Sequence, residues 1–260
     1  MTINIRTEEH IMMIEVDRPQ KYNALTREMY SKLAQAYYKL DQDDNLWVGV
    51  VYGNGKHFTS GLELTDWADL FNGGTGFSVD ESREIDPFYM VSEKRCSKPI
   101  IFAVQGYCYT WGVEMMLNAD IRVAASDAKF GQLEVLRGFF PCGGGTIRLA
   151  RDIGWSNAMR YLLTGETWSA EDAYRMGLVQ QVTEPGKQLE AAMALARKVA
   201  GVAPLGVRNI LKSGRLAETQ GEQAAKKVIF QDVAEVMKSD DMQEGLLSFI
   251  ERRKAVFKGK

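Results

Sequence analysis

The chain has 260 residues, of which 45% are hydrophobic and 25% charged, with a formal net charge of −2 at pH 7. This length can bury a sizeable core in one large domain, and the composition is typical of a globular protein in water. The small negative charge argues against a nucleic-acid-binding protein, and no apolar run approaches the roughly 20 residues that span a bilayer.

The cellular compartment is indicated by the first residues and by the cysteines. Residues 1–6 lack the basic start and apolar centre of a signal peptide, and they do not resemble an Arg-rich, Ser-rich organelle presequence. The three cysteines form no CxxC pair and leave one unpaired, which is typical of a reducing compartment: Cys96, Cys108 and Cys142. We therefore expect a cytoplasmic protein.

Strands and helices are expected to alternate through the first two thirds of the chain. Helical spacing behind the N-cap residue Thr26 predicts a helix to about Asp41, and a second helix is expected from Trp111 to Asn118. Residues 65–90 read as a long loop of the kind that is often functional. Short apolar or β-branched runs predict four strands, at Ile11–Val16, Trp47–Tyr52, Ile100–Val104 and Ile121–Ala125. This alternation predicts an α/β fold.

The last part of the chain has a different character. Helical periodicity is expected over Leu189–Val199, from Pro204 onward, over Gly221–Met237 and over Met242–Arg253. No strand pattern accompanies these helices, so we expect their apolar stripes to make subunit contacts. The sequence thus predicts an α/β body at 1–187 and a helical oligomerisation segment at 188–260.

Two glutamates are the most informative candidates for chemistry. Glu114 and Glu134 lie twenty residues apart, each in a mainly apolar segment beside a glycine-marked turn. An ionised carboxylate in such surroundings is costly unless it is paired or functional. Two carboxyl groups in one pocket can divide general acid and general base work. The spacing alone equally fits surface glutamates that offset helix dipoles.

Two glycine-bearing turns follow predicted strands, at residues 53–64 and 105–112. Glycine allows a tight turn and a close approach of backbone to a ligand, and a helix N-terminus offers unpaired N–H groups. Facing each other, two such turns would present two N–H donors to one developing oxyanion. Ordinary strand-to-helix turns explain each motif alone as well.

The ordered set of motifs resembles the crotonase superfamily, and enoyl-CoA hydratases in particular, from near Ile11 to the C-terminus. The segments that carry the resemblance are Gly61-Leu62-Glu63, Pro99–Tyr107, Glu114, Ala119–Ala124, Phe130–Glu134, Pro141–Thr146 and Arg148-Leu149. The resemblance implies a crotonase-like spiral of repeated β-β-α units, with the helical C-terminal segment serving trimerisation. It also implies a homotrimer or a dimer of trimers.

The resemblance assigns roles to particular positions. The backbone N–H groups of Leu62 and Trp111 would form an oxyanion hole for the thioester carbonyl. Glu114 would orient and activate a water, and Glu134 would supply the proton to the α-carbon of the enoyl thioester. The substrate and CoA would also contact Lys21, Ala24, Ser60, Gly61, Gly112 and, from a neighbouring subunit's tail, Phe257 and Lys260. Coenzyme A would be the carrier of the substrate, and no further cofactor is expected.

Two departures from the family pattern keep alternatives open. Trp111 stands where glycine is usual, and Glu63 replaces an aspartate. A backbone N–H survives at Trp111, but its indole adds bulk beside the pocket. The leading interpretation is a 2-enoyl-CoA hydratase; the alternatives are an isomerase, which needs only the carboxylate at Glu134, and a non-catalytic acyl-CoA-binding scaffold whose acyl site the indole fills.

The histidines, Ser60, Cys142 and the acidic residues of the long loop are not expected to form a further catalytic or metal site. His10 and His57 are the only histidines, so a histidine-rich metal site is excluded, and Ser60 lacks a G-x-S-x-G context. Cys142 is expected to be a packed thiol, within a turn and helix start at 141–146 that packs behind Glu134. Acidic side chains of the long loop are expected to be solvated: Asp69, Asp80, Glu81 and Asp86.

Overall fold

The structure is a computed structural model that describes residues 2–73 and 76–260. Its body contains a six-stranded sheet of order β1-β2-β3-β4-β6-β9 and a three-stranded sheet of order β5-β7-β8. The strands are β1 (Thr2–Glu8), β2 (Ile11–Asp17), β3 (Val48–Gly53), β4 (Ile100–Val104), β5 (Tyr107–Tyr109), β6 (Ile121–Ala125), β7 (Lys129–Gly131), β8 (Thr167–Ser169) and β9 (Gln181–Thr183).

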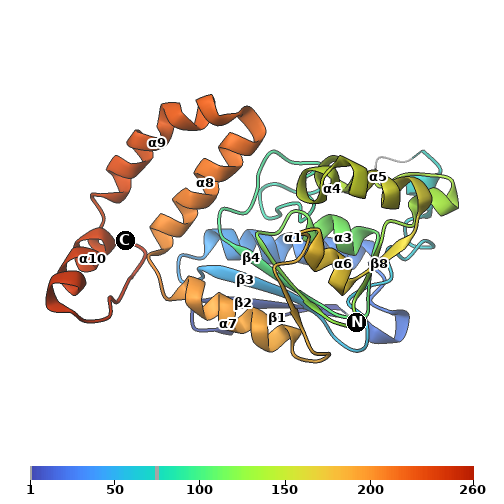
Figure 1. Cartoon of the computed structure of the whole chain (residues 1–260), viewed down its shortest axis with the longest axis horizontal. Coiled ribbons are helices and arrows are strands. Elements are labelled where there is room, and N and C mark those ends of the chain that lie inside the picture. Colours follow the sequence, from blue (N-terminus) through green and yellow to red (C-terminus); the bar gives the residue numbers. More distant parts are fainter. Residues whose placement is uncertain (1, 74–75) are drawn as a thin grey trace.

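Helices cover the sheets and form the C-terminal segment (Figure 1). Those of the body are η1 (Pro19–Lys21), α1 (Arg27–Gln42), α2 (Ala68–Phe71), α3 (Trp111–Met116), η2 (Glu134–Arg137), α4 (Gly145–Ile153), α5 (Trp155–Thr164), α6 (Ala170–Arg175) and α7 (Gln188–Ala200). The last three are α8 (Pro204–Gln220), α9 (Glu222–Val236) and α10 (Asp240–Glu251). No helix of the described residues is long and apolar enough to cross a membrane.

The body repeats a unit of two strands and a helix. From β2 to β9 the large sheet is parallel, while β1 and β2 pair antiparallel. Strand β4 leads into β5 and α3, and β6 leads into β7 and the helices after it, while β5 and β7 pair in parallel in the small sheet. Two successive turns of the chain, through β4 and β5 and through β6 and β7, therefore add a strand to each sheet, which confirms the expected spiral of β-β-α units.

The central strands of the large sheet are covered on both faces, so β3 and β4 are buried along their whole length. Alternate side chains such as Met12 and Ile14 pack with α1 in the main core, whereas Ile11 and Val50 pack against α7. Parallel strands buried on both faces read as continuous apolar runs, which is why the runs of β3 and β4 were visible in the sequence.

The predicted long elements are confirmed, with bounds that differ by a few residues. Thr26 is the N-cap of α1, since its hydroxyl accepts a hydrogen bond from Met29 N at 3.2 Å, and Pro204 opens α8. The expected loop at 65–90 has little regular structure, although α2 interrupts it; its residues 74–75 lie outside the described residues.

The helical segment from residue 188 divides in a way the sequence did not indicate. We expected these helices to have no sheet to cover, but α7 packs on the large sheet through Ala192, Met193 and Ala196. Only α8, α9 and α10 extend away from the body (Figure 1). The sequences of β3 and β4 do not alternate between apolar and polar residues, which is typical of strands that are covered on both faces. This pattern indicated a second covering layer, and our prediction for the C-terminal helices did not take it into account.

Candidate active site

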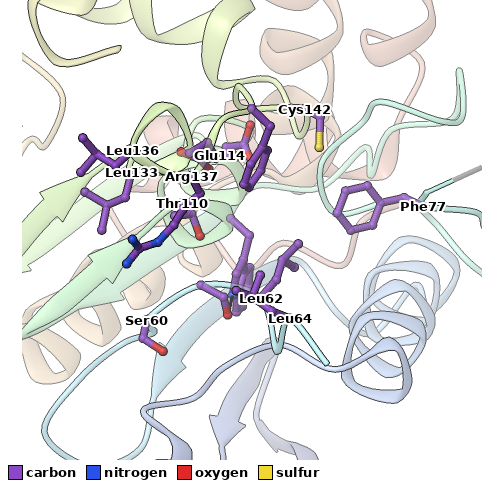
Figure 2. Close-up of a pocket in the computed structure, with 14 residues that line it drawn as sticks. Ser60, Leu62, Leu64, Phe77, Thr110, Glu114, Leu133, Leu136, Arg137 and Cys142 are labelled. Carbon is purple, nitrogen blue, oxygen red and sulfur yellow. Dashed lines mark hydrogen bonds between the residues drawn. The ribbon is translucent and has the colours of Figure 1, made fainter. Parts of the chain in front are cut away.

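One cavity of about 260 Å³ brings both glutamates and both glycine-marked turns together. Figure 2 shows Leu133 and Leu136 on one side of this cavity and Phe77 on the other. Its lining residues are Ser60, Gly61, Leu62, Leu64, Phe77, Thr110, Trp111, Glu114, Leu133, Glu134, Leu136, Arg137, Phe139 and Cys142. The walls are therefore mostly apolar, with two carboxyl groups among them, as in many sites for small organic ligands.

Glu114 lies on α3, a short helix that is buried on every side. Its side chain is 4% exposed, and its Oε1 accepts hydrogen bonds from Gly143 N at 2.7 Å and Gly145 N at 3.0 Å. Burial raises the pKa of Glu114 to about 7, while the two N–H donors and the nearby Arg148 oppose that rise. The donors favour the charged form and hold the carboxylate in one orientation.

Glu134 begins η2 and is 5% exposed. Its pKa is raised to about 8, mainly by burial and to a smaller extent by the negative charge of Glu114. When the amide of Gln132 turns its nitrogen toward Glu134, it donates to both carboxylate oxygens at 3.0 and 3.1 Å. Within residues 2–73 and 76–260, no backbone N–H of another segment donates to the Glu134 carboxylate.

The two carboxyl groups differ in a chemically useful way. Glu114 is held by two backbone donors, whereas the pKa of Glu134 is raised by its buried environment and by Glu114 itself. Near neutral pH the pair therefore favours a state with the proton on Glu134 and the charge on Glu114. Such a pair can accept one proton and donate another at the same site.

The two glycine-marked turns meet at this cavity through Leu62 and Trp111. Trp111 is the first residue of α3, so its backbone N–H lacks a partner within the helix. Across the described parts of the chain, neither this N–H nor that of Leu62 donates a recorded hydrogen bond. Gly61, before Leu62, has φ +118°, and a Cβ there would lie 2.5 Å from Thr110 Oγ1. Only glycine fits this close approach.

The indole of Trp111 does not fill the cavity. It is 1% exposed, packs beside Phe58 and Phe88, and donates from Nε1 to the carbonyl oxygen of Gly61 at 2.6 Å. The bulk expected beside the pocket is thus directed into the core.

Thr110 is a residue of this site that the sequence analysis did not single out. It has φ +49° and ψ −114°, an unfavourable conformation for a β-branched residue, and its buried Oγ1 has no recorded partner among the described residues. Thr110 N donates to Gly131 O at 2.8 Å, which fixes the turn before α3. Strained residues of this kind are concentrated at functional sites.

The remaining predicted contacts fall in four places. Ser60 and Gly61 line the cavity, and Ser60 N donates to Tyr22 O at 2.9 Å, which places the segment of Lys21 and Ala24 beside the cavity mouth. Gly112 does not line the cavity: a Cβ there would lie 2.4 Å from Thr59 Cγ2, so it is a packing glycine.

Phe257 and Lys260 are not brought to the cavity of their own chain. Asp241 N donates to Lys260 O at 3.0 Å, so the C-terminal tail lies along α10, on the opposite side of the molecule from α3 (Figure 1). Any contact with the cavity by this tail requires another subunit.

The turn and helix start expected at 141–146 are present, since α4 begins at Gly145, and they hold Glu114 through Gly143 N and Gly145 N. Two other local expectations are wrong. Cys142 is exposed and lines the cavity, with a pKa raised to about 11 by partial burial and by both glutamates, so it is a neutral thiol. Asp86 is 1% exposed rather than solvated, because its carboxylate accepts hydrogen bonds from its surroundings. The donors to Asp86 are Tyr30 Oη, Phe88 N, Met90 N and Val91 N.

Glu63, which replaces the aspartate usual in the family, still forms hydrogen bonds within its loop. Glu63 forms an ion pair with Arg18 at 2.9 Å and accepts a hydrogen bond from Thr65 Oγ1 at 3.1 Å. The Arg18 guanidinium is the main cause of a lowered pKa at Glu63. This carboxylate thus ties the turn to the end of β2.

Gly143→Ala should disturb Glu114 directly. A Cβ at Gly143 would lie 2.8 Å from Glu114 Oε2 and 3.1 Å from Phe88 Cδ1, and the backbone there needs no positive φ. The carboxylate must therefore move away from its donors, which we expect to raise the pKa of Glu114 further and to cost about 1–3 kcal/mol of folding free energy. Carbon-13 NMR of Glu114 and denaturant unfolding measure both effects. An unchanged Glu114 titration would contradict this account; Gly214→Ala on α8, where a Cβ meets open space and the backbone needs no positive φ, is the control.

Comparisons with known proteins agree with this geometry. The profile of the family described as enoyl-CoA hydratase/isomerase matches residues 6–260. The chain is 35% identical to the enoyl-CoA hydratase EchA19 of Mycobacterium tuberculosis, over 96% of this chain and 94% of that protein. It is 30% identical to the 2,3-dehydroadipyl-CoA hydratase of Escherichia coli, over 98% of each chain. The crystal structure of a "probable enoyl-CoA hydratase/isomerase" from Mycobacterium abscessus superposes with a TM-score of 0.95 at 39% identity, covering 100% of this chain and 99% of that one.

Proposed function

Because this chain belongs to the enoyl-CoA hydratase/isomerase family, we propose that it is a 2-enoyl-CoA hydratase. The observation that carries the proposal is the pair of buried glutamates, Glu114 and Glu134, on one cavity. Moving a double bond needs one carboxyl group that removes and returns a proton. Adding water needs a base for the water and an acid for the α-carbon, so two carboxyl groups favour the hydratase.

The proposed reaction uses each group once. Ionised Glu114 accepts a proton from water as the water oxygen bonds to the β-carbon. The electrons of the double bond move toward the thioester oxygen, where the N–H groups of Leu62 and Trp111 stabilise the developing negative charge. Glu134 then gives its proton to the α-carbon, which restores the thioester carbonyl and yields the 3-hydroxyacyl-CoA.

The electrostatics of the site support this division of roles. The two N–H donors from the start of α4 favour the charged form of Glu114, as a base requires. Burial and the charge of Glu114 keep the proton on Glu134, as an acid requires. The elevated pKa values suit proton transfer near neutral pH.

The dependence of kcat/KM on pH should be bell-shaped. Below about pH 7 Glu114 becomes protonated and can no longer accept a proton, and above about pH 8 Glu134 loses the proton it must donate. Activity should therefore fall on both sides of a maximum between these values, which describe the pair in the free enzyme. The measurement is kcat/KM for a short 2-enoyl-CoA, determined in buffered solution at a series of pH values. An activity that keeps rising well above the upper value would contradict Glu134 as the acid.

The walls of the cavity favour an apolar acyl chain. Leu64, Phe77, Leu133, Leu136 and Phe139 line it, and the side chains of these residues carry no polar group for a polar acyl chain. The segment of Lys21 and Ala24 lies beside Ser60 at the mouth, where we propose that the nucleotide end of CoA binds. No metal or organic cofactor is part of the proposal. Among the described residues, no group of three His, Cys, Asp or Glu side chains could hold a metal ion.

A homotrimer, or a dimer of trimers, is the second part of the proposal. Large apolar side chains are exposed on α9 and α10, where they would be buried by another subunit. These are Ile229, Phe230, Val233, Leu246, Leu247, Phe249 and Ile250. The tail with Phe257 and Lys260 follows α10, so a neighbouring subunit could bring these residues to the CoA. Light scattering coupled to gel filtration measures the mass, and a monomer at assay concentration would contradict this part.

The activity itself is tested by the absorbance of the conjugated enoyl thioester. Loss of this absorbance with a short and a long 2-enoyl-CoA, with formation of 3-hydroxyacyl-CoA, is the expected result. A displaced double bond would identify an isomerase instead. Unchanged enoyl-CoA despite binding would favour a scaffold, although the open cavity beside the buried indole of Trp111 argues against it.

A further inference from the structure

The side chain of Trp111 is connected to the other half of the oxyanion site. Its indole Nε1 donates to the carbonyl oxygen of Gly61 at 2.6 Å, fifty residues away in sequence. This distance is below the usual range of about 2.7–3.2 Å for an N–H···O hydrogen bond, so the two groups are in direct contact. Because the indole is 1% exposed, the bond is shielded from water.

The carbonyl that accepts this bond belongs to the same peptide unit as the N–H of Leu62. A peptide unit is planar, and in its trans form the C=O and the N–H point in opposite directions. The described chain contains no cis peptide bond. Fixing the direction of the Gly61 oxygen therefore fixes the direction of the Leu62 N–H, which is one of the two proposed donors to the thioester oxygen.

A second donor shares the same carbonyl and shows what the indole adds. Leu25 N also donates to Gly61 O, at 2.9 Å, and tethers the turn to the segment before α1. Gly61 itself has φ +118°, a region that glycine adopts without steric cost, so its own backbone preference does not fix the peptide plane. If Leu25 N were the single donor, the Gly61–Leu62 peptide plane could still rotate about that hydrogen bond. Two donors that approach the oxygen from different residues restrict this rotation. Hydrogen bonds to a carbonyl also polarise the peptide and strengthen its N–H as a donor.

We propose that Trp111 is a positioning residue as well as a donor. Its backbone N–H is one half of the oxyanion site, and its indole N–H orients and polarises the Gly61–Leu62 peptide that supplies the other half. Phe58 and Phe88 hold the indole from within the core. This inference rests on the proposed hydratase function, since an oriented donor pair matters for a reaction that develops charge on the thioester oxygen.

The test is Trp111→Phe, which keeps an aromatic ring and the backbone N–H but removes the indole donor. A matched control is Trp47→Phe, because Trp47 is also buried and its Nε1 donates to a backbone carbonyl, Asp44 O, at 3.1 Å, yet it precedes β3 and does not line the cavity. Both variants lose one buried indole hydrogen bond, so their thermal stabilities should fall by similar amounts. In Trp111→Phe the lost bond was made to the carbonyl of the Gly61–Leu62 peptide, whereas in the control it was made to a different peptide.

We expect kcat of Trp111→Phe to fall about tenfold with little change in KM, less than the 10²–10³ for loss of a whole donor, because Leu62 N–H is still present. The control should keep wild-type kcat. A direct readout is the C=O stretching frequency of a bound saturated acyl-CoA, which the donor pair lowers. In Trp111→Phe it should shift back toward the free value, and in Trp47→Phe it should not.

Three outcomes separate a failure of this inference from a failure of the proposed function. If wild-type protein hydrates enoyl-CoA but Trp111→Phe matches it in kcat and in carbonyl frequency, the positioning role is wrong and the function stands. If wild-type protein binds acyl-CoA without lowering the carbonyl frequency, the donor pair is not formed and the inference is overturned. If the frequency falls and depends on Trp111 but no hydration occurs, the proposed function fails while the positioning role stands.

Discussion

Replacing Glu134 by glutamine is expected to lower the rate of enoyl-CoA hydration by about 10²–10⁴-fold while acyl-CoA binding persists. Glutamine has nearly the same shape, so the cavity and its apolar walls are retained. It cannot deliver a proton to the α-carbon, because its amide is not acidic at neutral pH. The measurement is the loss of enoyl-thioester absorbance, together with calorimetric titration of a saturated acyl-CoA.

The same variant should show how much the buried Glu134 carboxylate lowers the free energy of unfolding. A carboxyl whose folded-state pKa is raised binds more protons in the folded chain, so its contribution to stability is lost as pH rises from the unfolded value toward the folded one. Glu134→Gln should therefore be more stable than wild type at mildly basic pH. A tenfold difference in proton affinity between the folded and unfolded chains corresponds to about 1.4 kcal/mol, so the gain in unfolding free energy is a few kcal/mol at most.

Glu190→Gln is the matched control for Glu134→Gln. Glu190 is exposed on α7, on the far side of the large sheet, and pairs with Lys187 at the surface. Its replacement removes one carboxylate without touching the cavity and should leave hydration intact. Wild-type turnover by Glu134→Gln would refute the assigned role of the acid.

Glu114→Gln should reduce hydration more than any isomerase activity. The water must lose a proton to Glu114 as it attacks the β-carbon, and loss of such a base costs about 10²–10⁴-fold. Moving a double bond between the 3,4 and 2,3 positions needs only Glu134, which this variant retains. Loss of the Glu114 charge also removes one cause of the raised pKa of Glu134, which should fall.

The measurement compares two rates on the same preparation. Hydration is followed with a 2-enoyl-CoA, and isomerisation with a 3-enoyl-CoA as conjugated absorbance appears. An equal loss of both would count against Glu114 as the group that activates water. Binding of a saturated acyl-CoA serves as the control for an intact cavity.

The sequence predicted the elements and residues whose signals are local. Continuous apolar runs identified β3, β4 and β6 because these strands are buried on both faces. The N-cap at Thr26 and the proline at the start of α8 act through neighbouring residues, so they were readable as well. Glu114 and Glu134 stood out because charge is rare in such apolar segments.

What the sequence could not indicate depends on distant contacts. Strands β5, β7 and β8 are three residues each and exist only through pairing with one another. The two N–H donors to Glu114 come from residues 29 and 31 positions further along the chain. No periodicity describes such a contact, so the orientation of Glu114 and the burial of Asp86 became visible only in the fold.

The most direct test of the central claim is to run the reaction in water enriched in oxygen-18 and to analyse the product by mass spectrometry. If Glu114 directs water to the β-carbon, the product is a 3-hydroxyacyl-CoA that carries the heavy oxygen at that position. Glu134→Gln should form this product far more slowly than wild type or Glu190→Gln. A product that has the mass of the substrate and a displaced double bond would contradict the account.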